Sequence, residues 1–334
     1  MSDPAKKVAV LGAGSWGTAL AILLARNGFE INLWGHDPAH MARLAHEREN
    51  ANYLPGISFP DNLSIQENLI ELAHEVRCFL VVVPSHAFRA TLQAIQPAIK
   101  SDTCIAWATK GLETGTHKLL SQVLGEVLGD TVRGAVVSGP TFAREVADNL
   151  PTGLTVASAS EAVAEDVAGW FRNDRVRVYT NSDVVGVQLG GAIKNVIAIA
   201  AGISDGLGFG ANARVALITR GLAELTRLGV AMGGHPETFM GLAGVGDLIL
   251  TCTDDQSRNR RVGIGLGRGR KLPEILGGLG QEAEGVTSAR ELLALAAELG
   301  VDLPITEQTA RVLAGECTPV EAVEALLSRE PRTE

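Results

Sequence analysis

The strongest constraint on the fold is a glycine-rich hexapeptide that follows a short apolar run near the start of the chain. Residues 8–11 have the pattern of a strand, the next six residues are GAGSWG, and an alanine- and leucine-rich stretch then predicts a helix. In a dinucleotide-binding βαβ unit, Gly12 makes the tight turn, Gly14 lets the backbone approach a pyrophosphate, and Gly17 allows close helix–sheet packing. The N–H groups at the helix start then face the anion. A glycine-rich turn without a ligand is the alternative.

The first half of the chain alternates β-branched runs with amphipathic stretches. Strands are expected at residues 7–11, 30–34, 79–83, 104–108, 134–138, 153–157 and 176–179, and helices at 17–27, 86–99 and 118–129. This alternation predicts a parallel, doubly wound sheet. After residue 181 almost only helical periodicity remains, broken near residues 205–210, 253–256 and 277–280. We therefore expect an α/β fold, with a Rossmann-like dinucleotide-binding domain at 1–181 and an all-helical substrate and catalytic domain at 182–334.

Composition excludes several classes of protein. The formal net charge of -9 disfavours nucleic acid as the main partner, because phosphate-backbone binding needs a basic footprint. Four scattered cysteines without CxxC spacing indicate reduced thiols in the cytosol and no metal site. The polar N-terminus does not fit a signal peptide. The longest apolar stretch, residues 184–203, is interrupted by Gln188, Lys194 and Asn195, so we expect a cytoplasmic protein without a membrane span.

The end of the second strand is where such a fold reads the ribose of a dinucleotide. An NAD-selective site usually carries an acid there. In this chain the residues that follow the strand at 30–34 are Gly35, His36 and Asp37, so glycine occupies the acidic position and the acid comes late. His36 either faces a 2′-phosphate or lies on an exposed loop, and the sequence leaves both interpretations open.

Lys194 lies in an unusually apolar helical stretch. Its neighbours three and four positions away are Gly190, Gly191, Ile197 and Ala198, and none of them is acidic. A buried ammonium without compensation is costly and its pKa falls. In that setting a lysine can give or take a proton near neutral pH. The alternative is a lysine at a domain rim whose ammonium reaches water.

Three other segments place polar groups where a ligand is expected. Lys110 ends a strand, and residues at the carboxyl ends of parallel strands point into the ligand crevice. Thr141 follows another strand and either faces the same crevice or caps a helix. Arg258 lies in a polar stretch after an apolar run and offers a planar fork suited to phosphate. The ordinary alternatives for the two cations are a loop lysine and a solvated arginine.

Together these segments resemble bacterial NAD(P)-dependent sn-glycerol-3-phosphate dehydrogenases. The resemblance covers nearly the whole chain through GAGSWG at 12–17, TKGLE at 109–113, SGPTFA at 138–143, GAIKN at 191–195, GDL at 246–248, SRNR at 257–260 and AEG at 283–285. Each motif alone is unspecific, whereas their common order is specific. Thr141 stands where the family more often has serine, and Val286-Thr287-Ser288 also depart a little, which affects only fine substrate geometry.

The resemblance implies hydride transfer between a nicotinamide and C2 of dihydroxyacetone phosphate or sn-glycerol 3-phosphate, which supplies the backbone for phospholipid synthesis. Lys194 would accept the proton in oxidation and donate it in reduction, and Asp247 would orient it. The implied substrate-binding residues are Lys110, Gly139, Thr141, Lys194, Asp247, Ser257, Arg258 and Asn259. The expected cofactor-binding residues are Gly12, Gly14, Ser15, Trp16, Gly17, His36, Lys110, Ala143, Arg258, Glu282 and Glu284. We expect both NADP(H) and NAD(H) to be used, with NADPH favoured.

Two other functions fit part of the pattern. A β-hydroxyacid dehydrogenase shares the nucleotide domain, the helical domain and a mid-helix lysine, but the SRN block at 257–259 disfavours it. A non-catalytic NAD(P)-binding redox sensor needs no buried lysine, so Lys194 separates it from an enzyme. The expected partners are the two small substrates, and the sequence leaves a homodimer open.

Overall fold

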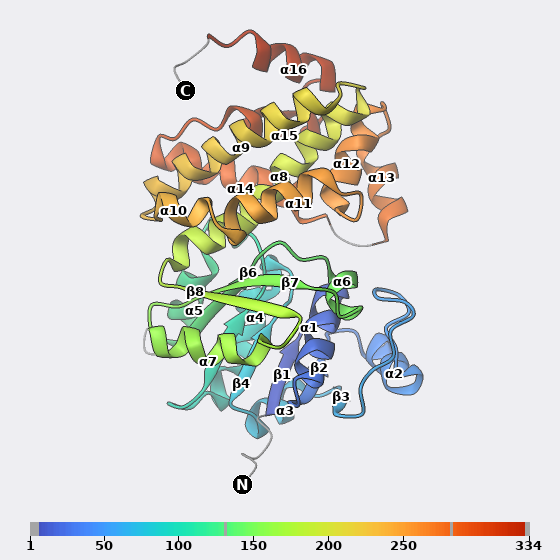
Figure 1. Cartoon of the computed structure of the whole chain (residues 1–334), viewed down its shortest axis with the longest axis vertical. Helices are drawn as coiled ribbons and strands as arrows, with labels where there is room; N and C mark the ends of the chain where they lie inside the picture. The colour runs from blue at the N-terminus through green and yellow to red at the C-terminus, as the bar shows by residue number, and fades with distance from the viewer. Residues whose placement is uncertain (1–6, 130–131, 281–282, 331–334) are drawn as a thin grey trace. The chain divides into compact units, whose positions relative to one another are not determined.

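The computed structural model describes residues 7–129, 132–280 and 283–330 (Figure 1). The chain divides into two compact units, one of residues 1–113 and 118–184, the other of residues 114–117 and 185–334. The boundary expected from the sequence is residue 181. The short segment 114–117 belongs to the second unit, which the periodicity of the sequence does not predict.

One eight-stranded sheet forms the centre of the first unit, in the order β3-β2-β1-β4-β5-β6-β7-β8. The strands are β1 (Lys7–Leu11), β2 (Glu30–Trp34), β3 (Leu63–Gln66), β4 (Cys78–Val81), β5 (Cys104–Trp107), β6 (Arg133–Ser138), β7 (Thr152–Ala157) and β8 (Val176–Asn181). All neighbours are parallel except β6 and β7. The chain order reverses direction between β1 and β4, which makes the loop after β1 the expected ligand crevice of such a sheet.

The helices of the first unit pack in two groups, as a doubly wound sheet requires (Figure 1). α1 contacts α6 and α7, whereas α4 contacts α3 and α5. Their bounds are α1 (Ser15–Arg26), α2 (Pro38–Glu47), α3 (Leu69–Glu75), α4 (Ser85–Ile95), a 3₁₀ turn η1 (Gln96–Ala98), α5 (Leu120–Leu128), α6 (Ala143–Ala147) and α7 (Glu161–Phe171). The Rossmann-like fold class is therefore confirmed.

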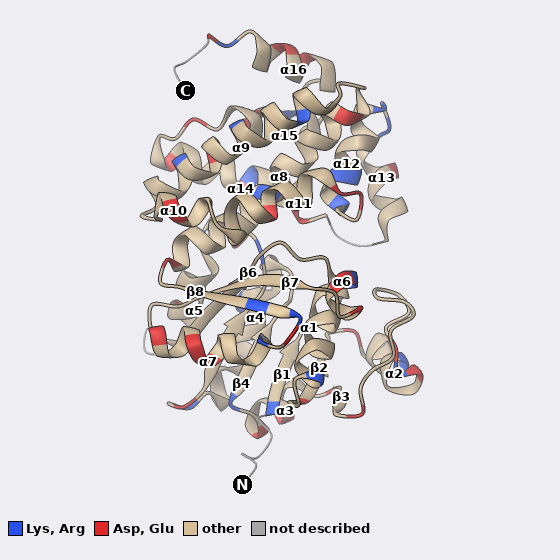
Figure 2. Cartoon of the chain, viewed as in Figure 1, with Lys and Arg blue, Asp and Glu red and all other residues tan. Residues whose placement is uncertain are grey.

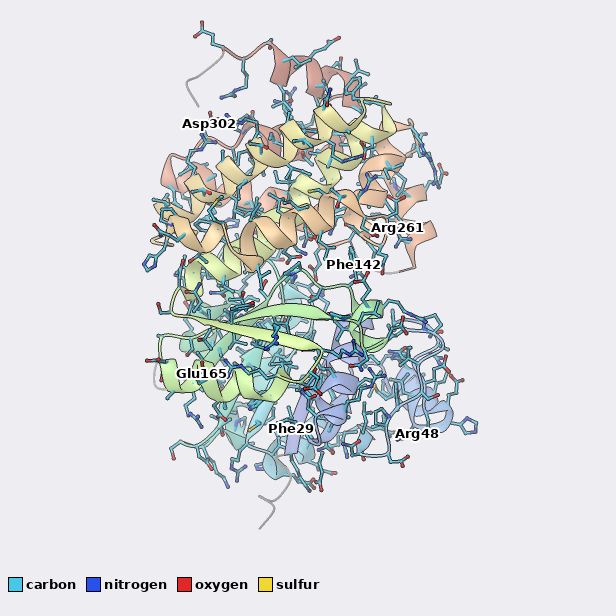
Figure 3. All side chains as sticks on the ribbon, viewed as in Figure 1. Phe29, Arg48, Phe142, Glu165, Arg261 and Asp302 are labelled. Carbon is cyan, nitrogen blue, oxygen red and sulfur yellow. The ribbon has the colours of Figure 1, made fainter. Side chains whose placement is uncertain are left out.

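Three local features differ from the sequence-based prediction. β3 was not expected, because it has four residues of which only Leu63 is buried. Arg48, labelled in Figure 3, holds the start of this edge strand in place by donating to the carbonyls of Pro60 and Leu63, both at 2.7 Å. The antiparallel β6–β7 pair departs from an all-parallel sheet. Residues 277–279, expected to be a loop, end a helix instead.

The second unit is helical and is built around one long buried helix, α8 (Val184–Gly206). The others are α9 (Ala211–Ala231), α10 (Pro236–Phe239), a π-helical turn η2 (Leu242–Gly246), α11 (Asp247–Thr253), α12 (Arg258–Gly267), α13 (Leu272–Leu279), α14 (Glu284–Leu299), α15 (Pro304–Ala314) and α16 (Pro319–Leu327). α8 is long and apolar enough to cross a membrane, but 89% of its apolar window is buried inside the protein. It therefore has the character of a core helix.

Small residues on α8 determine how closely its neighbours approach. A Cβ on Gly190 would lie 2.1 Å from the carbonyl oxygen of Ala243 in η2, and one on Gly202 would lie 2.2 Å from that of Arg260 in α12. Backbone therefore packs directly on backbone at both places. The first contact places η2, and with it the start of α11, against α8 one turn before Lys194, and the second places the start of α12 near the C-terminal end of α8.

Candidate active site

The three glycines of the loop after β1 have different roles, because packing requires Gly12 and Gly17 but not Gly14. Gly12 has a φ of +128°, and a Cβ there would lie 2.5 Å from the carbonyl oxygen of Val82. A Cβ on Gly17 would lie 1.8 Å from the carbonyl oxygen of Gly12. Gly14 has an ordinary φ of -79°, and no described atom lies within 4 Å of an added Cβ. Because no described atom fills this space, a pyrophosphate can approach the backbone at the start of α1 there.

Two further features of this loop suit a dinucleotide. Gly14 is the N-cap residue of α1, and no described side chain caps this N-terminus. The buried indole Nε1 of Trp16 has no hydrogen-bond partner among the described residues, and a buried donor is rarely left so. Ser15 beside it is half-buried. The residues present therefore fit a polar ligand at this helix start.

The end of β2 shows why glycine follows it. A Cβ on Gly35 would lie 2.8 Å from Sδ of Met41 and 3.0 Å from Cβ of Ala13, so packing alone accounts for this glycine. The carboxylate of Asp37 accepts a hydrogen bond from the Ala39 N–H at 3.0 Å and caps α2. His36 is exposed between them. The glycine at position 35 is thus no evidence about the 2′ position, whereas Asp37 already has a structural role.

Two other predicted segments of the first unit follow β5 and β6. Lys110 is half-buried after β5, and the preceding Thr109 donates to the carbonyl of Val83 at 2.8 Å. The Thr141 hydroxyl donates to the carbonyl of Gly139 at 3.3 Å, so it does not cap α6. Phe142, labelled in Figure 3, takes the N-cap position, and Ala143 begins the helix. The alternative in which Thr141 caps a helix is therefore excluded, and its role in substrate binding stays a prediction.

In the second unit Lys194 makes a buried ion pair. Its Nζ donates to Oδ1 of Asp247 at 2.6 Å and to Oγ1 of Thr251 at 2.9 Å. Lys194 is 6% exposed and Asp247 is fully buried. The expectation of an uncompensated ammonium is wrong, because the acid comes from α11 and not from α8. The periodicity of α8 identifies only those neighbours of Lys194 that lie on α8 itself. The orienting role given to Asp247 requires this contact.

Hydrogen bonds at the starts of α12 and α14 connect these two helices with each other and with α8. Ser257 caps α12, its Oγ accepting from the Arg260 N–H at 3.2 Å, and Arg258 beside it is half-buried. Oδ1 of Asn259 accepts from the Gly285 N–H at 2.9 Å. Asn195, next to Lys194, donates to Oε2 of Glu284 at 3.1 Å. These bonds connect α8, α12 and α14; the predicted Glu282 lies outside the described residues.

Sequence reasoning missed two members of the lysine cluster. Thr251 lies one helical turn after Asp247, and this four-residue spacing was the available signal. Cys252 is buried beside the pair, and burial raises the pKa of its thiol to about 12. It therefore stays protonated at neutral pH and is not a proton-transfer group.

A doubly wound sheet with an open glycine loop, followed by a helical unit with a buried Lys–Asp pair, defines a dinucleotide-dependent oxidoreductase. Comparison with known proteins identifies which family. The N-terminal model of NAD-dependent glycerol-3-phosphate dehydrogenase matches residues 7–164, and the C-terminal model matches residues 183–324. The chain belongs to this family, which confirms the resemblance stated from its motifs.

Individual relatives agree over full length. The glycerol-3-phosphate dehydrogenase [NAD(P)+] of Thioalkalivibrio sulfidiphilus is 57% identical and that of Pseudoalteromonas translucida 55%, each over 100% of both chains. The crystal structure of the Coxiella burnetii glycerol-3-phosphate dehydrogenase has a TM-score of 0.94 and 46% identity, covering 97% of this chain and 99% of that one. These matches favour an enzyme of this family over a β-hydroxyacid dehydrogenase or a redox sensor.

Proposed function

We propose that this NAD(P)-dependent oxidoreductase interconverts dihydroxyacetone phosphate and sn-glycerol 3-phosphate, with Lys194 as the proton donor and acceptor. The observation that carries the proposal is the buried Nζ of Lys194, held 2.6 Å from Asp247 and 2.9 Å from Thr251. A lysine this deep in an apolar helix needs a compensating carboxylate, and a simpler core residue would avoid that need. The arrangement therefore supports a chemical role.

The chemistry requires a proton donor beside C2. As hydride reaches the ketone carbon, negative charge develops on its oxygen, and a positioned ammonium both stabilises that charge and donates the proton. Asp247 and Thr251 hold the ammonium of Lys194 in a fixed position, so the ammonium does not have to reorient during the reaction. In oxidation the same nitrogen takes the proton from the C2 hydroxyl.

The substrate phosphate is assigned to the start of α12. Arg258 offers a planar fork, and the first-turn N–H groups of this ten-residue helix favour an anion. Asn259 fixes the same turn to α14 through Gly285. We also assign Lys110, Gly139, Thr141, Ser257 and Asn259 to binding of the substrate. Binding the phosphate at a fixed point orients the reacting carbon.

The dinucleotide is assigned to Gly12, Gly14, Ser15, Trp16 and Gly17, with contributions from His36, Lys110, Ala143, Arg258, Glu282 and Glu284. When bound it supplies or accepts the hydride. Both NADP(H) and NAD(H) are used, with NADPH favoured, because His36 is exposed at the end of β2 while Asp37 is engaged in capping α2. The neighbouring carboxylate is thus less available to the ribose of NAD(H).

The proposed setting is the cytoplasm, with small molecules as the only partners. A net charge of -9 disfavours nucleic acid, and acidic and basic residues are both spread over the described elements (Figure 2). The product would supply phospholipid synthesis. A homodimer is compatible with these assignments.

The direct test mixes the purified chain with NADPH and dihydroxyacetone phosphate and follows the nicotinamide absorbance. A β-ketoacid in place of the triose phosphate serves as the control substrate. NADPH oxidation with the triose phosphate alone supports the proposal. Oxidation with the β-ketoacid alone, or with neither, contradicts it.

A further inference from the structure

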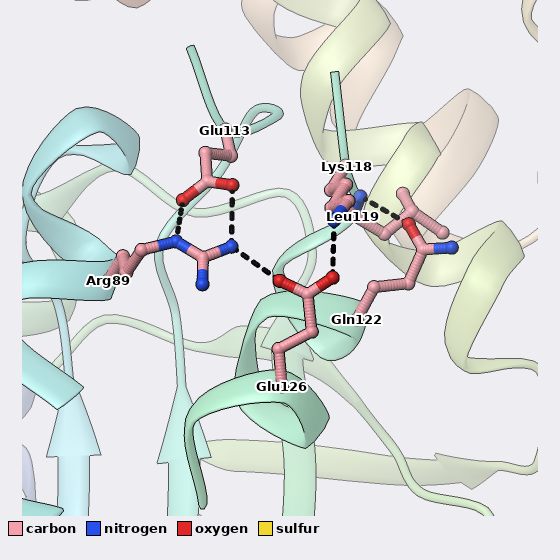
Figure 4. Close-up of polar contacts among 6 residues, drawn as sticks. All are labelled: Arg89, Glu113, Lys118, Leu119, Gln122 and Glu126. Atoms are coloured by element: carbon pink, nitrogen blue, oxygen red, sulfur yellow. Dashed lines mark hydrogen bonds and ion pairs between the residues drawn. The ribbon is translucent and has the colours of Figure 1, made fainter. Parts of the chain in front are cut away.

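The peptide that carries Lys110 is attached to the first unit on both sides of the lysine. Before it, Thr109 donates to the carbonyl of Val83 at 2.8 Å. After it, the carboxylate of Glu113 receives two hydrogen bonds from Arg89 of α4, at 2.6 Å from Nε and 2.9 Å from Nη2 (Figure 4). The Glu113 side chain is 10% exposed. Two parallel bonds fix both the position and the direction of a carboxylate.

Arg89 also contacts a second, more exposed ion pair, which Glu126 and Lys118 form. Nη2 of Arg89 also donates to Oε2 of Glu126 on α5 at 2.6 Å, and Lys118 pairs with the other oxygen of that carboxylate (Figure 4). The Glu113 N–H donates to the carbonyl of Lys118 at 2.9 Å. Glu126 and Lys118 are 39% and 40% exposed, so their ion pair is screened by solvent. The inner pair is therefore the structural anchor and the outer pair provides a matched control.

Gly111 makes this anchor relevant to Lys110. Its φ of +103° lies between the lysine and Glu113, in a region that glycine adopts without strain. Such a residue gives the peptide conformational freedom that β5 alone does not remove. The direction of Lys110 then depends on what holds the chain beyond the glycine.

We propose that Glu113, held by Arg89, is a positioning residue that fixes the Lys110 peptide for the reaction. The inference rests on the proposed function, in which Lys110 contacts the substrate. Neither Glu113 nor Arg89 touches the reactants in this proposal; they act through Lys110. A lysine at position 89 would keep the positive charge but could not reproduce the two parallel hydrogen bonds to the Glu113 carboxylate. Arg89→Lys is therefore expected to have the same effect as Glu113→Gln.

Hydrogen–deuterium exchange tests the anchor without using activity. The amides of residues 109–113 are expected to exchange faster in Glu113→Gln than in wild type, with no change in Glu126→Gln. Exchange by these amides that is identical in wild type and Glu113→Gln would overturn the anchor, whatever the enzyme catalyses.

A double-mutant cycle with Lys110→Met tests the consequence for catalysis. Glu113→Gln is expected to lower kcat/KM for dihydroxyacetone phosphate on the order of 10- to 100-fold, as a small misplacement of a substrate-contacting group does. In the Lys110→Met background it is expected to lower it little further, because the residues act as one unit. Glu126→Gln keeps wild-type kinetics.

The outcomes separate this inference from the proposed function. Equal losses in both backgrounds mean that Glu113 acts only on general stability, which overturns the positioning role. Faster exchange with unchanged kcat/KM overturns it as well. If Lys110→Met itself keeps wild-type kcat/KM, Lys110 does not contact the substrate, and the predicted effect of Glu113→Gln on kcat/KM fails with it. Hydrogen–deuterium exchange then still decides whether Glu113 anchors the peptide.

Discussion

At the scale of single residues, the Lys194–Asp247 pair makes the chemistry and the stability of the site inseparable. Removing one member of a buried pair leaves the other charge unpaired, at a penalty of about 3–5 kcal/mol. Both side chains are buried here. A loss of activity in a Lys194 variant therefore needs a companion variant that restores the charge balance.

Lys194→Met is expected to lose about two to four orders of magnitude in turnover, because the proton donor is gone. Lys194→Met with Asp247→Asn should recover most of the lost Tm and none of the turnover. Both variants should still bind NADPH, measured by the fluorescence of the nicotinamide. Wild-type-like turnover in the single variant would remove Lys194 from the mechanism.

Arg258→Lys keeps the charge and loses the planar fork, so it should raise KM for dihydroxyacetone phosphate by at least about tenfold, the equivalent of one lost charge-assisted hydrogen bond. KM for both substrates is measured by steady-state kinetics. An unchanged KM for the triose phosphate would show that Arg258 does not bind its phosphate.

His36→Ala is expected to reduce the preference for NADPH over NADH without lowering kcat with NADH. One hydrogen bond to a charged group contributes about 1.5–3 kcal/mol, so the preference is moderate. The measurement is the ratio of kcat/KM for the two cofactors in wild type and variant. A ratio that stays the same would show that another residue reads the 2′ position.

At the scale of elements, the sequence predicted what local pattern controls and missed what tertiary contacts control. The loop from β1 to α1 was predictable because its three glycines follow an apolar strand. β3 was not, since it pairs as an edge strand held by Arg48 from outside its own run. The antiparallel β6–β7 pair was missed for the same reason: strand direction depends on how the chain crosses the sheet.

The glycine loop gives an element-scale prediction because its glycines have separable roles. Gly14→Val should fold with a Tm near that of wild type, since a Cβ there meets no described atom, but should lose most of its stabilisation by NADPH. Gly17→Ala should lower the Tm itself, since its Cβ would lie 1.8 Å from backbone. Thermal unfolding with and without NADPH compares the two. Full NADPH stabilisation of Gly14→Val would place the cofactor elsewhere.

At the scale of the whole molecule, the predicted site residues come from both units. The sequence located them because family motifs keep their order along the chain, yet it could not pair Lys194 with Asp247. These residues are 53 positions apart and meet where η2, which leads directly into α11, packs on Gly190 of α8. The same dependence on distant contacts appears at Glu224 of α9, whose buried carboxylate caps α15 by accepting from the N–H groups of Ile305 and Thr306 at 2.5 and 3.1 Å.

Glu224 makes global stability depend on pH in a direction opposite to that of most carboxylates. Burial raises the pKa of Glu224 above its ordinary 4.5, with the Ile305 and Thr306 hydrogen bonds opposing the shift. A raised folded-state pKa means that folding favours the protonated form, so the contribution is present below the unfolded pKa and is lost as pH rises through the folded one. Glu224→Gln cannot titrate. Its destabilisation relative to wild type, from urea unfolding, should therefore be larger at about pH 4 than at neutral pH, a range set by the reference pKa of glutamate. A destabilisation that grows with pH would show that the buried carboxylate form is the one that folding favours.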